Sequence, residues 1–119
     1  MYIARRIKNC PVTDVLGDGF VTGQKTEDGS DVVVTISWLI REVIRAVPAK
    51  DHLEDFITYC VDIGQALQKP GDIVIRKESA EWLEKAVVDL GVFPHARVVE
   101  AFKRHLCAPE YAQDEAVTE

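Results

Sequence analysis

Hydrophobic residues recur at helical spacing in four segments between residues 35 and 106 of this chain. The clearest segment begins near Thr35 or Ser37, because either hydroxyl can accept a hydrogen bond from the first free amides of a helix. Pro48 ends it. This segment predicts an amphipathic helix, because its apolar residues fall on one stripe: Ile36, Leu39, Ile40, Val43, Ile44 and Val47.

The second helical segment runs from Asp51 to a stop at Pro70-Gly71. Asp51 and Glu54 form an acidic equivalent of the capping box, and their charges favour the positive end of the helix dipole. One face of this helix is apolar and is expected to be buried: Leu53, Phe56, Ile57, Cys60 and Leu67.

Two more helices are predicted in the second half of the chain. One runs from about Glu78 to Leu90 and is stopped by Gly91, because glycine readily adopts the left-handed conformation of a helix end. The other begins at Pro94, a favourable first residue of a helix. Its inward-facing residues are expected to be Val98, Val99, Phe102 and Leu106.

The remaining segments have a β-like pattern. Tyr2–Lys8 alternates weakly between apolar and polar residues. Phe20–Glu27 and Ser30–Ile36 flank Asp28-Gly29, a dipeptide typical of type I′ hairpin turns, in which both central residues have positive φ. Asp72–Arg76 also alternates, and we expect it to pair with the hairpin, because three strands form a more stable sheet than two.

Together these elements predict an α+β fold, with an N-terminal β-hairpin plus one further short strand packed with about four short amphipathic helices. A length of 119 residues fits one domain, which we place at residues 1–106. Residues 107–119 contain four acidic residues and neither Lys nor Arg, so they are expected to form an acidic C-terminal tail.

The composition narrows the classes of partner. With 20 acidic and 14 basic residues the net charge is −6, which argues against a general nucleic-acid binder, since such proteins need a concentrated basic surface. No apolar run approaches the roughly 20 residues of a membrane-spanning helix, so no membrane partner is expected. Cys10, Cys60 and Cys107 are far apart, a pattern typical of reduced thiols in a cytosol.

The residue types that are common in active sites and metal sites do not form a recognisable motif in this chain. His52, His95 and His105 lack the spacings of zinc sites, and the last two are expected to be solvent-exposed at the two ends of the fourth helix. No G-x-S-x-G motif is present. The sequence therefore predicts no enzyme, no metal and no cofactor. The alternative is a small enzyme with a deep pocket lined by His95, Asp62 or Cys60.

Contact with another protein is the function that the pattern favours. Trp38 lies at the edge of the first helical stripe, where it either flanks the core or forms part of an interface. The basic residues of the first strand either meet the acidic tail of a neighbouring copy, in a head-to-tail contact that closes into a ring or continues as a stack, or are solvated. The candidate partner-binding residues are Trp38, Arg5, Arg6, Lys8, Asp28, Phe93, Tyr111, Asp114 and Glu115.

A family resemblance adds a biological setting. A glycine-punctuated hairpin leads into Val34–Glu42, a charged amphipathic helix follows over Leu53–Leu67, and a strand passes into a helix over Ile73–Leu83. A last helix contains Val98, Val99 and Phe102. This order, over residues 20–106, resembles that of small, mostly uncharacterised proteins of tailed bacteriophages. The resemblance implies phage origin and a place in the virion, its assembly or host takeover, and it supplies no catalytic residues.

The expected function is therefore that of a non-enzymatic phage protein that acts by protein–protein contact. We expect a minor virion or assembly component that associates with itself or with other phage proteins, in the host cytoplasm or incorporated in the virion. On this hypothesis, deleting residues 108–119 weakens a salt-sensitive oligomer. The alternative is a phage inhibitor or regulator that binds a host defence or transcription protein, since an acidic protein can occupy a basic groove.

Overall fold

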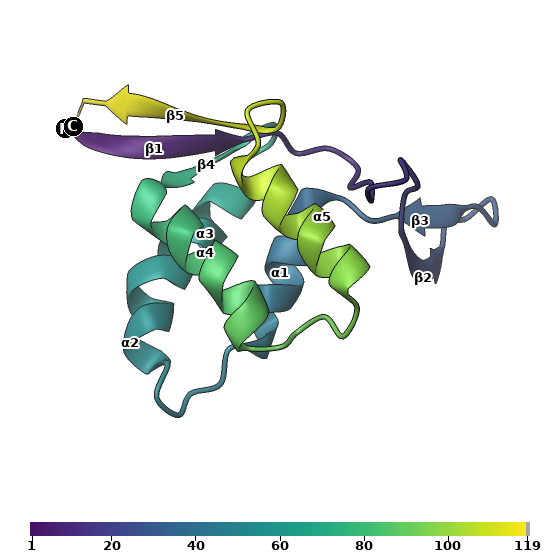
Figure 1. Cartoon of the computed structure of the whole chain (residues 1–119), viewed down its shortest axis with the longest axis horizontal. Helices are drawn as coiled ribbons and strands as arrows, with labels where there is room; N and C mark the ends of the chain where they lie inside the picture. The colour runs from purple at the N-terminus through teal and green to yellow at the C-terminus, as the bar shows by residue number, and fades with distance from the viewer. Residues whose placement is uncertain (119) are drawn as a thin grey trace.

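A three-stranded antiparallel sheet lies across one side of a group of helices, with a two-stranded hairpin beside them (Figure 1). This computed structural model describes residues 1–118. The sheet has the order β4-β1-β5, formed by Ile73–Arg76, Tyr2–Ile7 and Ala112–Val117. The hairpin pairs β2 (Val21–Lys25) with β3 (Asp31–Val33). The predicted α+β class is confirmed.

The four expected helical segments are present, and one of them changes its geometry partway along. The helices are α1 (Ile36–Ala46), α2 (Leu53–Asp55) continuing through the π-helical segment η1 (Phe56–Cys60) into α3 (Val61–Leu67), then α4 (Lys77–Asp89) and α5 (Ala96–Cys107). Thr35 caps α1 by accepting a hydrogen bond from the Trp38 amide at 3.4 Å. The N-cap of α2 is His52, which makes no side-chain capping bond, so the expected capping by Asp51, with its φ of 66°, is wrong.

The core lies between one face of the sheet and the helices below it (Figure 1). Ile7 of β1 stands opposite Ile73 of β4, and both side chains are at most 2% exposed. Leu83 of α4 and Phe102 of α5 are fully buried in the same cluster. The sheet therefore fixes the positions of α4 and α5 through direct apolar packing.

The third predicted strand pairs with β1, and the expectation that it joins the hairpin is wrong. Pairing with β1 lets β4 bury Ile73 and Ile75 on the helices, with 2% and 1% of their surfaces exposed. The hairpin offers no such apolar platform, since Val21 and Val33 are 56% and 47% exposed. Burial of two β-branched side chains therefore decides the partner of β4.

The hairpin is present, but its turn is not of type I′. Gly29 has a φ of 86°, whereas Asp28 lacks the positive φ that such a turn requires at both central positions. The Thr26 amide bonds the Ser30 carbonyl at 2.8 Å, which gives a three-residue loop ending in a bulge at Gly29. Asp28 fixes this loop by accepting the Thr26 hydroxyl and the Ser30 amide, and these hydrogen bonds lower the pKa of its carboxyl to about 2.

The predicted acidic tail is instead the edge strand β5, which pairs along the whole of β1 from Tyr2↔Val117 to Ile7↔Ala112. The two chain ends lie side by side as a result (Figure 1). Because residues 112–117 complete the sheet, they belong to the same domain as residues 1–106. Deleting residues 108–119 would remove this strand, so the deletion would report on folding and not on association alone.

The opposite charges of the two ends pair within one chain, an arrangement that differs from both of those suggested by the sequence, a contact between copies and solvated ends. The Arg5 guanidinium donates from Nε to Asp114 at 2.8 Å and from Nη1 to the Leu106 carbonyl at 3.3 Å. Arg6 pairs with Glu115 at 3.1 Å on the opposite face of the strands. The Arg5 hydrogen bond lowers the pKa of Asp114.

Replacing Asp114 by Asn should lower the free energy of unfolding by about 1 kcal/mol. The substitution removes the charged partner of Arg5, whose side chain is only 11% exposed. Urea denaturation followed by circular dichroism measures the change. Glu115→Gln is the matched control and should have little effect, because both members of its pair with Arg6 are more than 40% exposed. Equal losses in the two variants would contradict this assignment.

Candidate partner-binding site

The π-helical segment η1 turns the two halves of its helix to different sides. The Val61 amide bonds the carbonyl of Phe56, five residues earlier, so each residue of the segment turns the helix by less than in an α-helix. After η1, Ile63 and Ala66 face the core, together with Cys60 at its end. Residues before this point are rotated away from the face that one continuous α-helix would bury.

The rotation exposes apolar side chains that the sequence places in the core. Leu53 is 58% exposed, Ile57 is 60% exposed and Phe56 is 36% exposed. The expectation that these three residues are buried with Cys60 is therefore wrong. A helical wheel assumes a constant angle per residue, and the wider turn of η1 breaks that assumption. π-helical turns are frequent at functional sites.

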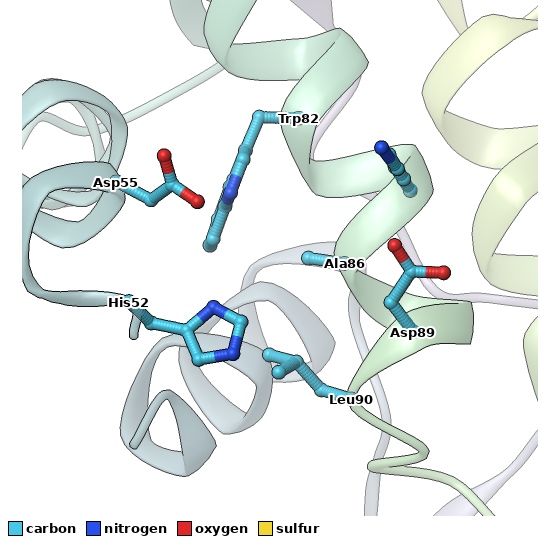
Figure 2. Close-up of a pocket in the computed structure, with 7 residues that line it drawn as sticks. His52, Asp55, Trp82, Ala86, Asp89 and Leu90 are labelled. Carbon is cyan, nitrogen blue, oxygen red and sulfur yellow. The ribbon is translucent and has the colours of Figure 1, made fainter. Parts of the chain in front are cut away.

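The same rotation directs a more polar face toward α4. Tyr59 of η1 stacks on Trp82 of α4, with ring centroids 5.8 Å apart and planes at 16°. His52 and Asp55 lie on the same side of this helix and face α4 across a gap (Figure 2). The stacked rings hold α4 beside η1 and leave the gap open.

This gap is a cavity of about 220 Å³ between α2 and α4. Figure 2 shows the Asp55 carboxylate beside the face of the Trp82 indole, and the His52 ring directed toward Leu90. The cavity is smaller than the ~300 Å³ at which small-molecule sites usually begin, so its size suits one side chain of a partner. Its lining residues are His52, Asp55, Trp82, Lys85, Ala86, Asp89 and Leu90.

A second hollow is lined by other residues of the same helix, Leu53 and Phe56 in place of His52 and Asp55. It has a volume of about 210 Å³ and is lined by apolar residues alone: Val47, Pro48, Ala49, Leu53 and Phe56. We call this hollow the apolar groove. Ile57 lies one residue beyond Phe56 and extends the exposed apolar surface along η1. The α2–η1 helix therefore lines both a polar cavity and an apolar groove.

The cavity and the apolar groove differ in the chemical groups that line them. The cavity brings together an indole, an imidazole, two carboxylates and an ammonium group, and its lining contains neither a hydroxyl nor a thiol nucleophile. Within residues 1–118, no group of three or more His, Cys, Asp or Glu side chains is placed to hold a metal ion. No helix in the same range is long and apolar enough to cross a membrane.

The residues named for the enzyme alternative are Cys60, Asp62 and His95. Cys60 is buried, which raises the pKa of its thiol to about 11. The Asp62 carboxylate accepts the Ser79 hydroxyl at 2.8 Å and the Arg76 amide at 3.1 Å, and so fixes the start of α4. His95 is exposed at the start of α5. They are absent from the linings of both hollows at α2.

His105 is fully buried, although the sequence predicts an exposed residue at the end of a helix. Its ring stacks on Tyr111 at 3.8 Å, and its Nδ1 lies 3.8 Å from the Cys10 sulfur. Its Nε2 has no hydrogen-bond partner among the described residues. Burial raises the pKa of the Cys10 thiol, the opposite direction to the lowered pKa of an activated cysteine.

The aromatic residues proposed for partner contact mostly pack against other residues of the same chain. Trp38 is half-buried against the core, as is Phe93, whose ring lies 6.0 Å from that of Phe102. Tyr111 covers His105.

The charged candidates are likewise used inside the molecule or dispersed over it. Arg5, Arg6, Asp114 and Glu115 form the ion pairs of the sheet. Asp28 stabilises the hairpin turn, while Lys8 is exposed beside a different cavity, near Tyr111. Arg6, Lys8 and Tyr111 line this cavity of about 370 Å³ together, whereas Asp28, Trp38 and Phe93 lie elsewhere, so the structure gathers only part of the proposed set.

The exposed residues of α2 and η1 were missed because apolar periodicity assigns Leu53, Phe56 and Ile57 to the core. Comparison with protein-family models, curated proteins and solved structures finds no match to this chain. The proposed function is therefore based on the local geometry at α2 and η1.

Deleting Thr58, an exposed residue of η1, should convert the π-helical segment into a regular α-helix. Leu53 and Ile57 would then turn toward α4, and the protein should bind less of a hydrophobic fluorescent dye. Dye titration, with circular dichroism to check the fold, measures this change. Thr58→Ala keeps the chain length and is the control. Unchanged dye binding in the deletion variant would contradict the role assigned to η1.

The free energy of unfolding should decrease as the pH falls below about 6.5, because burial lowers the pKa of His105. The unfolded chain then binds a proton that the folded chain excludes, with a slope of at most about 1.4 kcal/mol per pH unit for one group. Arg104 adds to this lowering and Glu100 opposes it.

Urea denaturation at pH 7.5 and 5.5 tests this expectation. His105→Phe retains a ring against Tyr111 and should reduce the pH dependence, whereas His95→Gln should leave it unchanged, since His95 is exposed. An identical pH dependence in all three proteins would exclude His105 as its source.

Proposed function

We propose that this chain is a non-enzymatic protein that acts by protein–protein contact through the surface of α2 and η1. The observation that carries the proposal is the exposure of Leu53, Phe56 and Ile57 beside the cavity of Trp82. Exposed apolar side chains that gather in a large patch with a polar rim mark interaction sites. Tryptophan and tyrosine are enriched at binding hot spots, and Trp82 and Tyr59 supply both types here.

The proposed setting is a tailed bacteriophage, in which the protein serves as a minor virion or assembly component and forms oligomers. Support for the setting comes from the resemblance of residues 20–106 to small phage proteins. Support for assembly comes from the type of surface, since apolar side chains beside a polar rim are typical of protein interfaces. In this role the protein is present in the host cytoplasm and is incorporated in the virion.

The second candidate is an inhibitor or regulator of a host defence or transcription protein. The observation that favours it is the charge near the cavity, where Glu54 and Asp55 lie on the first turn of α2, Asp51 just precedes the helix, and Asp89 lies across the gap. Such a rim suits a basic partner. The net charge of −6 points the same way.

A photo-crosslinking residue placed at Ile57 should react with a second copy or with another phage protein in the cells that naturally express this protein. Mass spectrometry of the crosslinked product identifies the partner. A residue at Val88 is the matched control, because Val88 is similarly exposed, at 54%, and lies outside both hollows. Ile57→Asp should weaken the association by about 2 kcal/mol, as a hot-spot substitution does.

The identity of the crosslinked protein separates the two candidates. A host protein captured from position 57 favours the inhibitor, and a phage protein favours the assembly role. Equal crosslinking from positions 57 and 88 would contradict the proposed use of this surface.

A further inference from the structure

The cavity between α2 and α4 contains two carboxylates that the chain itself leaves without a cation. Asp55 lines the cavity from α2, and Asp89 lines it from α4. Neither carboxylate forms an ion pair or a side-chain hydrogen bond within residues 1–118. Asp55 is also half-buried, so its charge loses part of its hydration and gains no contact in return. A cationic group in the cavity would supply that contact.

The end of α4 adds to this negative charge. Asp89 is the last residue of α4, and Leu90, which follows it at the C-cap, also lines the cavity. The unsatisfied carbonyls of a helix C-terminus carry about half an elementary negative charge, so this helix end attracts cations. The last turn of α4 contains no basic residue that would offset it. The cavity wall is therefore negative through its backbone as well as through its side chains.

Trp82 adds an aromatic ring to the same cavity. In the view of Figure 2 its indole lies between the carboxylates of Asp55 and Asp89. The face of an indole attracts a cation, and a planar guanidinium can stack on a ring while it donates hydrogen bonds to carboxylates. With His52 neutral, the lining has two carboxylates against the one ammonium group of Lys85. Ring and charge therefore favour the same type of ligand.

We propose that this cavity binds one arginine side chain of a partner protein, with the guanidinium against the Trp82 indole and hydrogen-bonded to Asp55 and Asp89. The inference rests on the proposed function and names the chemistry by which the surface of α2 and η1 recognises its partner. A volume of about 220 Å³ suits a single side chain. The exposed apolar side chains of α2 and η1 then contact other residues of the same partner.

The arginine is expected from a different protein and not from a second copy. Every arginine of this chain already contacts a carboxylate, a carbonyl or an aromatic ring of the same chain. Two copies with a net charge of −6 each also repel one another. A basic segment of another protein is instead attracted, both by the cavity and by Glu54, which is exposed next to Asp55 in the sequence.

An NMR titration of the whole chain, labelled with ¹⁵N, tests the cavity directly. The probe is a short capped peptide with one arginine between glycines, and the readout is the indole N–H signal of each tryptophan. The signal of Trp82 should shift, whereas that of Trp38, which packs against the core outside the cavity, should not. Trp38→Phe assigns the two signals.

Two further peptides show which property of the side chain is recognised. A peptide with lysine in place of arginine should bind more weakly, because an ammonium group lacks the planar fork of donors. A peptide with citrulline, which has nearly the same shape and no charge, should not bind.

Substitutions in the lining should change the affinity for the arginine peptide in opposite directions. Asp55→Asn and Asp89→Asn should each weaken binding about fivefold, and Lys85→Gln should strengthen it about twofold. Glu81→Gln is the matched control, because it removes an exposed negative charge of α4 outside the cavity, and it should bind as the wild type does. Circular dichroism checks the fold of each variant. Because Asp55 is half-buried, added salt should weaken this contact less than it weakens pairs of exposed charges.

The outcomes separate this inference from the proposed function. Equal binding of the arginine peptide and either control peptide would overturn the arginine site, as would equal affinities of Asp55→Asn, Asp89→Asn and Glu81→Gln. An arginine peptide that fails to bind, while position 57 still crosslinks more than position 88, would overturn this inference and leave the proposed function standing. Binding of the arginine peptide together with equal crosslinking from the two positions would contradict the proposed function alone.

Discussion

The pairing of β1 with both of its neighbours is the constraint on which the rest of the structure depends. Because β4 passes directly into α4 at Lys77, the register of β4 on β1 also determines where α4 begins. Asp62 ties α3 to the same junction through the Arg76 amide and the Ser79 hydroxyl. The position of Trp82 relative to α2 follows from these two connections. A sheet formed by the two chain ends therefore defines a cavity at the far side of the helices.

The π-helical turn at η1 then determines which side chains of α2 and η1 face α4 and which are exposed to solvent. Within a regular helix, Leu53 and Ile57 would turn toward α4 and gain roughly 1.5–3 kcal/mol each on full burial. The wider turn forgoes that stabilisation and places His52, Asp55 and Tyr59 against α4 in their stead. An arrangement that sacrifices core burial at several neighbouring positions is typical of a binding surface.

The sequence predicted correctly those elements whose limits are set by residues within the element itself. Helix α1 has a capping Thr35, one apolar stripe and a stop at Pro48, so its limits could be read from the chain. Long-range pairing could not be read in this way, because β5 consists mainly of small and acidic residues and gains its stability from β1. The burial of His105 depends on Tyr111, which stacks on it from the loop before β5. The exposure of Leu53, Phe56 and Ile57 was missed because periodicity assumes a constant helical turn.

Polar and apolar side chains have separate tasks in this molecule. Three buried or bonded carboxylates fix backbone or strand geometry: Asp14 in the loop of residues 14–18, Asp62 at the start of α4, and Asp114 on β5. The arginines that oppose the acidic strand are engaged within the chain and are not offered to a neighbour. Apolar side chains are exposed at residues 15–16 and along α2 and η1. Association through the surface of α2 and η1, as proposed, would depend on removing apolar area from water, and added salt should not weaken it as it would weaken a contact between charged chain ends.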